Sequence, residues 1–314
     1  MTLAGFAGAT DPGRRRRRNE DAYVIDPPLF AVADGMGGAQ AGEVASKLAA
    51  GAVKERGADV ESLIQEANRR VHQRSLEDPS TSGMGTTLTV AAVEDGVVSI
   101  GHVGDSRAYL VRDGSLDQLT EDHSLVGELV RSGKLSPEEA ETHPQRSMIT
   151  RALGTDPDVD VDIFAVEPRP GDLFLLCSDG LTTMVDDREI LRLVGEKRGD
   201  LAGLVKALIK AANKGGGEDN ITVIAFEIGE AGASPSPVVE PEPDDEDTLT
   251  EADGVPVTDT MVVSADELTA AYEREQQAPP PSSRGRFVTR VLSFLVVIAL
   301  LFGFAYLILW GLAS

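Results

Sequence analysis

Apolar and polar positions along residues 1–229 follow two different periods. Apolar residues at helical spacing predict helices over 41–56, 60–76, 124–132, 137–141 and 201–212, with Ser136 capping the fourth. Short apolar runs predict strands over 30–33, 86–93, 97–103, 108–112, 172–177 and 221–228. The pairs Asp95-Gly96 and Asp113-Gly114 are typical of hairpin turns and predict antiparallel pairing. Strand runs interrupted by helix pairs favour an α+β sandwich over an alternating βαβ fold.

The pattern changes completely near the C-terminus. Residues 291–310 (VLSFLVVIALLFGFAYLILW) contain no charge over twenty positions, which is long enough to cross about 30 Å of hydrocarbon as a helix. Arg284, Arg286 and Arg290 precede this run, so the positive-inside rule places the N-terminal side in the cytoplasm. No signal peptide is expected at the N-terminus. The segment 284–314 is therefore predicted to be a basic juxtamembrane stretch followed by one transmembrane helix in the cell membrane.

Residues 230–283 carry 14 acidic residues, one basic residue and eight of the 17 prolines. Such a segment cannot bury enough apolar surface to offset the entropy of ordering, so we expect a disordered linker. Threonines stand among its acids in DTLT (247–250) and TDTMVV (258–263), either as phosphorylation sites or as ordinary solvated linker. The chain thus divides into a catalytic domain (1–229), an acidic linker (230–283) and a membrane segment (284–314).

Charge and cysteine content exclude several classes of function. The chain has a formal net charge of −23, and residues 1–229 hold 38 acidic against 25 basic side chains, so nucleic acid is not expected as a partner. The single cysteine, Cys177, excludes an intramolecular disulfide and lies in an apolar strand, where core packing is the expected role. The run Arg14–Arg18 is a local exception. It is either a basic rim that attracts phosphorylated peptides or a solvated charge run.

Acidic residues recur beside glycine at the ends of predicted strands. They stand in NED (19–21), DGMGG (34–38), GDSR (104–107), SDG (178–180) and EDN (218–220). Buried like charges repel unless a cation lies between them. Oxygen ligands suit Mg²⁺ or Mn²⁺, and no Cys/His spacing in the sequence suits zinc. The ordered set predicts a divalent metal site.

The sequence resembles the metal-dependent protein phosphatases, also called type-2C Ser/Thr phosphatases, and looks most like their bacterial membrane-anchored branch. The resemblance covers residues 5–228 and rests on TDPG leading to RxxNED, AVADGMGG, AGEVAS, GTT, GHVGDSRAYL, LTEDHS, ITRALG, LLCSDGL and EDNITVI, in that order. It implies a four-layer α-β-β-α sandwich with two central, mainly antiparallel sheets. It also implies two Mn²⁺ or Mg²⁺ ions, with a weaker third.

The resemblance implies a role for each matching position. Asp34 would bridge two metal ions, with the Gly35 carbonyl and Glu20 completing the second-metal site and Asp179 and Asp219 holding the first metal. Asp105, with Asp179, would help to bind the third. Asp21 would hydrogen-bond a water of the metal site, and Arg16 would bind the substrate phosphate in a fixed fork.

The function implied is hydrolysis of phosphoserine and phosphothreonine in proteins by a water that two metals activate, without a covalent phosphoenzyme. The partners would be phosphorylated proteins, with membrane Ser/Thr kinases and their substrates the natural ones. Met36 stands where eukaryotic relatives carry a candidate general-acid histidine, so the proton donor is not identified. His102 and His123 are expected to be structural. Residues 123–151 match the mobile flap of bacterial relatives and should overhang the site.

Three other functions are compatible with the sequence. One is a regulatory phosphatase of an anti-sigma-factor antagonist. Another is a non-catalytic adaptor that binds phosphopeptides on the same fold, which the full set of metal carboxylates argues against. The third is an acidic protein that binds Ca²⁺ at a membrane, although no twelve-residue calcium loop is present.

Overall fold

The computed structural model describes residues 2–37, 41–55, 59–141 and 143–230. Their strands form two antiparallel sheets. The first has the order β1-β11-β10-β7-β8, from β1 (Thr2–Asp11), β11 (Ile221–Gly229), β10 (Leu173–Cys177), β7 (Arg107–Arg112) and β8 (Ser115–Gln118). The second has the order β2-β3-β5-β6-β9, from β2 (Asp21–Asp26), β3 (Leu29–Met36), β5 (Leu88–Glu94), β6 (Val97–Val103) and β9 (Asp162–Val166), with the short β4 (Gly85–Thr86) pairing β3.

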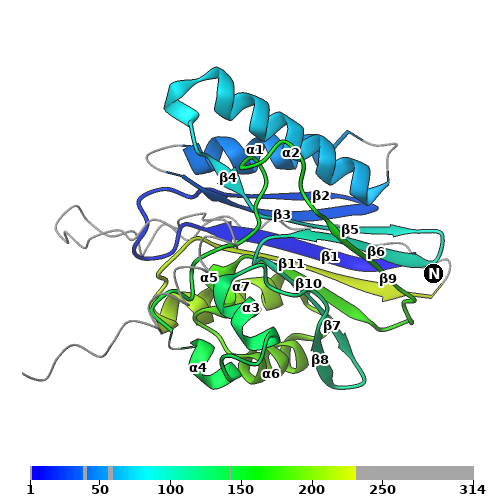
Figure 1. Cartoon of the computed structure of the whole chain (residues 1–314). Coiled ribbons are helices and arrows are strands. Elements are labelled where there is room, and N and C mark those ends of the chain that lie inside the picture. The colour runs from blue at the N-terminus through cyan, green and yellow to red at the C-terminus, as the bar shows by residue number, and fades with distance from the viewer. Residues whose placement is uncertain (1, 38–40, 56–58, 142, 231–314) are drawn as a thin grey trace, which may run out of the picture. The chain divides into compact units, whose positions relative to one another are not determined.

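Helices cover the outer face of each sheet, as Figure 1 shows. The helices α1 (Ala41–Val53) and α2 (Val60–Glu77) pack apolar side chains onto the second sheet. On the first sheet lie α5 (Asp179–Thr182), α6 (Asp187–Lys197) and α7 (Leu201–Gly215). Two short helices, α3 (Leu125–Arg131) and α4 (Pro137–Glu141), lie between β8 and β9 in the sequence, and a 3₁₀ turn (Pro79–Thr81) follows α2. The α+β class and the two antiparallel sheets are confirmed.

A third apolar cluster fills the space between the two sheets. Its centre is a stack of three fully buried phenylalanine rings. Phe226 of β11 lies 4.4 Å from Phe30 of β3 and 5.0 Å from Phe174 of β10, measured between ring centroids. Because Phe30 belongs to one sheet and its two neighbours to the other, this stack joins the sheets directly.

The local signals that were strongest in the sequence are confirmed. Asp95 and Asp113 both have φ of 51°, and each precedes a glycine of positive φ in a hairpin turn. At α4, the Ser136 hydroxyl accepts from the Glu139 N–H (3.2 Å) and the Glu139 carboxylate accepts from the Ser136 N–H (2.9 Å), which is a capping box.

The hydrophobic pattern did not predict β1, β2, β8, β9, α5 or α6. β1 carries mainly small residues, including Gly5 and Gly8, and gains its place by pairing with β11 more than 200 positions away. The strand expected over 86–93 is in fact broken at Thr87, and the one expected over 30–33 continues to Met36. The break has a use: Thr87 donates its N–H to the Asp34 carbonyl and accepts the Asp34 N–H on its hydroxyl, each at 2.9 Å.

Within the described ranges no helix is long and apolar enough to span a membrane. The predicted linker (230–283, apart from Glu230) and the predicted transmembrane helix (291–310) lie outside those ranges.

Candidate metal centre

Three aspartates from distant parts of the chain meet where the two sheets face each other. Asp34 lies near the end of β3, Asp179 begins α5 directly after β10, and Asp219 precedes β11. Burial, together with the neighbouring carboxylates, raises the pKa of Asp34 well above its usual range and that of Asp179 to about 7. A side-chain hydrogen bond with Asp34 lowers the pKa of Asp179, but other effects are larger.

Asp21 lies deeper, at the start of β2, and is held by two hydroxyl groups. Ser178 (2.9 Å) and Thr222 (2.6 Å) both donate to its Oδ2 atom. Burial raises its pKa to about 7, an effect that these two hydrogen bonds oppose. The other oxygen, Oδ1, is buried and has no hydrogen-bond partner, as is Oδ1 of Asp179. Two buried acceptors without donors indicate that a cation or water belongs beside them.

Glu20 and the Gly35 carbonyl meet at Gly42, near the start of α1. A Cβ at Gly42 would lie 2.3 Å from Glu20 Oε2 and 2.8 Å from the Gly35 oxygen, so only glycine leaves room for both groups. Gly35 is equally confined, because a Cβ there would lie 2.1 Å from the Gly42 oxygen. The carboxylate and the carbonyl predicted to complete the second-metal site therefore stand side by side.

Arg16 contributes the positive charge of the cluster. Its Nη2 atom donates to Asp219 Oδ2 at 2.8 Å, and its side chain is 22% exposed. Burial lowers its pKa, but Asp219, Asp34 and Asp179 outweigh that effect and raise the pKa above its usual value. Its guanidinium thus lies at the three aspartates with part of its surface open to solvent, which suits a group that would receive a phosphate.

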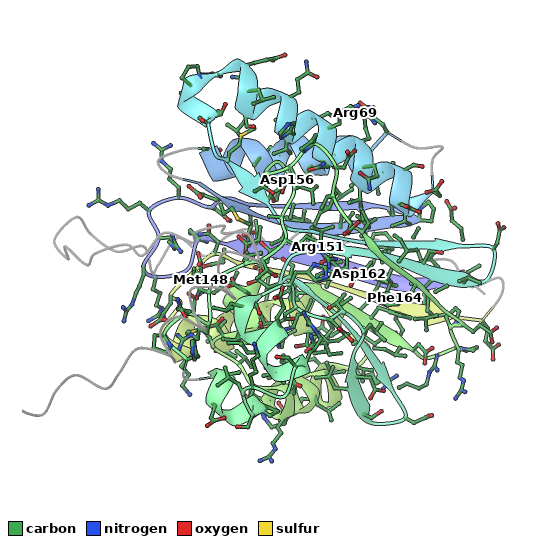
Figure 2. The ribbon with its side chains drawn as sticks, viewed as in Figure 1. Arg69, Met148, Arg151, Asp156, Asp162 and Phe164 are labelled. Carbon is green, nitrogen blue, oxygen red and sulfur yellow. The ribbon has the colours of Figure 1, made fainter. Side chains whose placement is uncertain are left out.

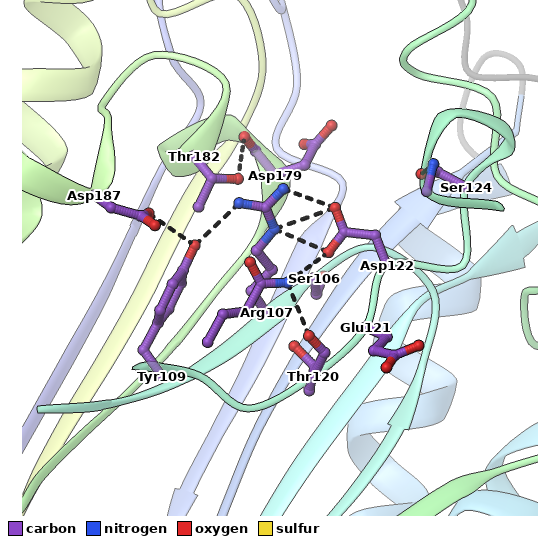
Figure 3. A network of polar contacts seen from close by, with 12 residues as sticks. Ser106, Arg107, Tyr109, Thr120, Glu121, Asp122, Ser124, Asp179, Thr182 and Asp187 are labelled. Carbon is purple, nitrogen blue, oxygen red and sulfur yellow. Dashed lines mark hydrogen bonds and ion pairs between the residues drawn. The ribbon is translucent and has the colours of Figure 1, made fainter. Parts of the chain in front are cut away.

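Asp105 belongs to the same cluster. It is buried, and both burial and the charge of Asp179 raise its pKa. The neighbouring Arg107 forms a two-pronged ion pair with Asp122, with Nη2–Oδ2 at 2.7 Å, and donates to the Tyr109 hydroxyl at 3.0 Å (Figure 3). Arg107 opposes the rise in the pKa of Asp105 and of Asp179. No role was predicted for Arg107 or Asp122, because nothing in the sequence marks these two residues as an ion pair.

Described residues of the segment 123–151 contact the site. Ile149 packs on Met36, and Arg146 lies 3.8 Å from Glu218, next to Asp219. At the base of this segment, Arg151 donates to Asp162 Oδ1 at 2.7 Å, and the two side chains lie together in Figure 2. Met36 is buried and cannot donate a proton, so no histidine equivalent stands at that position.

His102 and Cys177 have structural roles, as expected. His102 is fully buried, and burial lowers its pKa to about 4, so the ring is neutral at pH 7. Burial raises the pKa of the Cys177 thiol to about 12, which leaves it unreactive.

These residues fit a divalent metal. No group of three His, Cys, Asp or Glu side chains in the described part of the chain is arranged to hold an ion as it stands. The elevated pKa values and the two orphaned carboxylate oxygens nevertheless show a surplus of negative charge that the local cations do not neutralise. The donors are all oxygens, the set that Mg²⁺ and Mn²⁺ prefer.

Comparison with known proteins agrees with this chemistry. The family model for protein phosphatase 2C matches residues 14–219. The chain is 42% identical over 236 residues to the serine/threonine phosphatase stp of Listeria monocytogenes, covering 69% of this chain and 93% of that protein. It is 36% identical over 307 residues to the serine/threonine protein phosphatase PstP of Mycobacterium tuberculosis, covering 93% of this chain and 58% of that protein.

Solved structures give the same result. A crystal structure of the M. tuberculosis phosphatase PstP/Ppp aligns with a TM-score of 0.69 at 39% identity, covering 73% of this chain and all of that one. The catalytic domain of PstP in complex with two manganese ions aligns with a TM-score of 0.67 at 37% identity, covering 73% of this chain and 99% of that one. The chain belongs to the protein phosphatase 2C family and is a metal-dependent protein serine/threonine phosphatase.

Proposed function

We propose that this phosphatase acts on phosphoserine and phosphothreonine in proteins at the inner face of a cell membrane, where it opposes membrane Ser/Thr kinases. The observation that carries the catalytic part is the convergence of Asp34, Asp179, Asp219 and Arg16. Mn²⁺ or Mg²⁺, when bound, would neutralise phosphate charge and supply a water nucleophile near neutral pH.

Side chains of the site would hold the metals, bind the phosphate and accept a proton. Asp34, Asp179 and Asp219 would hold the first metal and Asp34, Gly35 and Glu20 the second, while Asp105 would serve a weaker third. Arg16 would exchange part of its contact with Asp219 for two phosphate oxygens and so orient the phosphorus for attack. Asp21, fixed by Ser178 and Thr222, would accept a proton at its unpartnered Oδ1 from a water of the site.

The location rests on the sequence. The uncharged run 291–310 and the three arginines before it support a single-pass anchor, with residues 1–229 in the cytoplasm. The acidic segment 230–283 would serve as the tether. Membrane kinases and their phosphorylated loops would then be the nearest substrates. Recovery of the full chain only in the soluble fraction would contradict the anchor.

The catalytic proposal is tested with the full chain in detergent, Mn²⁺ and a phosphothreonine peptide. Asp34→Asn and Asp179→Ala should each reduce kcat/KM by at least about 100-fold, and EDTA should abolish turnover. Asp156→Asn is a matched control, because Asp156 is exposed on the loop before β9 (Figure 2). Full activity in Asp34→Asn, or turnover that survives EDTA, would refute the metal mechanism.

Comparing turnover of a phosphorylated kinase loop with turnover of a phosphorylated anti-sigma-factor antagonist separates the two candidate substrate classes.

A further inference from the structure

The loop between β1 and β2 carries five consecutive arginines, of which the site uses only Arg16. The side chains of Arg14, Arg15, Arg17 and Arg18 are exposed and are called the arginine rim below. The rim is the strongest local concentration of positive charge in a chain whose net charge is −23.

Both ends of this loop are fixed to the segment that carries Asp219. The Gly217 carbonyl accepts from the N–H groups of Arg14 (2.8 Å) and Arg15 (3.2 Å). At the other end, Asn220 Nδ2 donates to the Arg18 carbonyl at 2.8 Å. Gly13 makes this approach possible, because its φ is +75° and a Cβ there would lie 2.2 Å from the backbone carbonyl oxygen of Asp219. The rim is therefore held at the edge of the metal centre.

The counter-charge of Arg15 is weakly held. Arg15 lies 3.8 Å from Glu218, and both side chains are about half exposed (53% and 45%). Such a pair contributes little to stability in water, so Arg15 can exchange Glu218 for another carboxylate at small cost. Arg146, from the segment 123–151, lies 3.8 Å from the same Glu218, which brings a further cation to this edge.

An acidic enzyme repels a phosphorylated, acidic substrate over a distance, and a local group of cations at the site reverses that repulsion where the substrate must bind. We infer that the arginine rim selects phosphoserine and phosphothreonine flanked by aspartate or glutamate, with Arg16 on the phosphate and the rim on the flanking carboxylates. This inference rests on the phosphatase function proposed above and names its substrate class.

The test uses the full chain with Mn²⁺, the double variant Arg15→Gln/Arg17→Gln, and two phosphothreonine peptides that differ only in acidic or neutral flanking residues. The wild type should prefer the acidic peptide. The double variant should lose roughly 3- to 10-fold in kcat/KM on that peptide and change less than about twofold on the neutral peptide and on p-nitrophenyl phosphate. The preference should also shrink between 0.05 and 0.5 M salt, concentrations that shorten the Debye length from about 14 to about 4 Å.

The matched control is Arg69→Gln/Arg192→Gln, which removes two exposed arginines from α2 and α6 whose partners are glutamates on their own helices (Figure 2 labels Arg69). It should leave both peptides unaffected. Equal turnover of the two peptides by the wild type, or an equal loss on both in the double variant, would overturn the inference. Failure of the wild type to hydrolyse the neutral peptide and p-nitrophenyl phosphate would instead refute the proposed function.

Discussion

The backbone N–H of Gly104 donates a 3.0 Å hydrogen bond to Nδ1 of His123. Because Nδ1 accepts, the ring proton lies on Nε2, which donates to Asp162 Oδ2 at 3.0 Å. The His123 N–H returns a 2.8 Å hydrogen bond to the Gly104 carbonyl. His123 thus ties the turn that carries Asp105 to the base of the segment 123–151.

Replacing His123 should loosen that turn. His123→Ala leaves the buried Gly104 N–H without an acceptor, so we expect the free energy of unfolding to fall by about 1–3 kcal/mol and kcat to fall with it. His123→Asn offers an oxygen near the Nδ1 position and should recover part of both. Urea unfolding and phosphopeptide turnover measure the two effects. His72→Ala is the control, since His72 makes one 3.1 Å contact with the Gly154 carbonyl. Identical losses at both histidines would disprove the tie.

Asp34→Asn should separate stability from activity. The carboxylates around Asp34 repel its charge, and a neutral amide removes that repulsion, so the EDTA-treated variant should have a higher free energy of unfolding than the wild type at pH 8. Its activity with Mn²⁺ should be lost. Asp156→Asn should change neither quantity. A metal-free Asp34→Asn protein less stable than the wild type would show that repulsion among these carboxylates does not destabilise the metal-free fold.

His102 should make stability depend on pH. Its folded pKa of about 4 lies below the unfolded value of 6.5, so the unfolded chain binds the extra proton between these limits. The contribution of neutral His102 to the free energy of unfolding is complete above pH 6.5. It is lost as the pH falls toward 4, by up to about 1.4 kcal/mol per pH unit. Urea unfolding of the wild type and of His102→Gln between pH 7 and 5 should show the steeper slope in the wild type. The acidic cluster titrates in both proteins and cancels. Parallel slopes would rule out this role.

Gly180 sets the approach of two loops that carry metal ligands. A Cβ at Gly180 would lie 2.0 Å from the Asn220 carbonyl oxygen, so Gly180→Ala should push Asp179 away from Asp219. We expect a loss of about 1–3 kcal/mol in stability and a higher Mn²⁺ concentration for half-maximal activity. Gly195→Ala is the control, because nothing lies within 4 Å of a Cβ at that helical glycine, and it should gain about 0.5–1 kcal/mol. Normal Mn²⁺ dependence in Gly180→Ala would contradict this account.

The local chemistry of the site could be predicted from the sequence because motifs keep their order along the chain. The acids at 20, 21, 34, 105, 179 and 219 were all named, and the structure brings Asp34 into electrostatic range of the other four aspartates and Glu20 beside Gly35. The roles assigned to them remain predictions for the experiments above. The supporting residues were not found, because nothing local marks Arg107 as the partner of Asp122, or Asn220 as the donor that fixes the Arg18 carbonyl.

Some of the elements that escaped prediction have identifiable physical causes. β1 and β9 lack a strong intrinsic strand signal and are stabilised by partners far away in the sequence, β11 for the former and β6 for the latter. α6 is rich in charged residues that form pairs along its own surface, such as Arg192 with Glu189 at 2.6 Å, which hides its short apolar stripe of Ile190, Leu193 and Val194. The pairing of β1 with β11 and of β9 with β6 depends on the assembled core, which a short stretch of sequence does not reveal.

The phenylalanine stack between the sheets has a consequence for tuning this enzyme. Asp34 lies on β3, in the sheet that contains Phe30, whereas Asp179 and Asp219 lie next to β10 and β11, in the sheet that contains Phe174 and Phe226. The distance between Asp34 and the other two aspartates therefore depends on how the three phenylalanine rings pack between the sheets. Replacing one ring by a smaller side chain, as in Phe226→Leu, would alter catalytic geometry without changing any polar group. The apolar interior between the sheets thus helps to determine how fast the enzyme works.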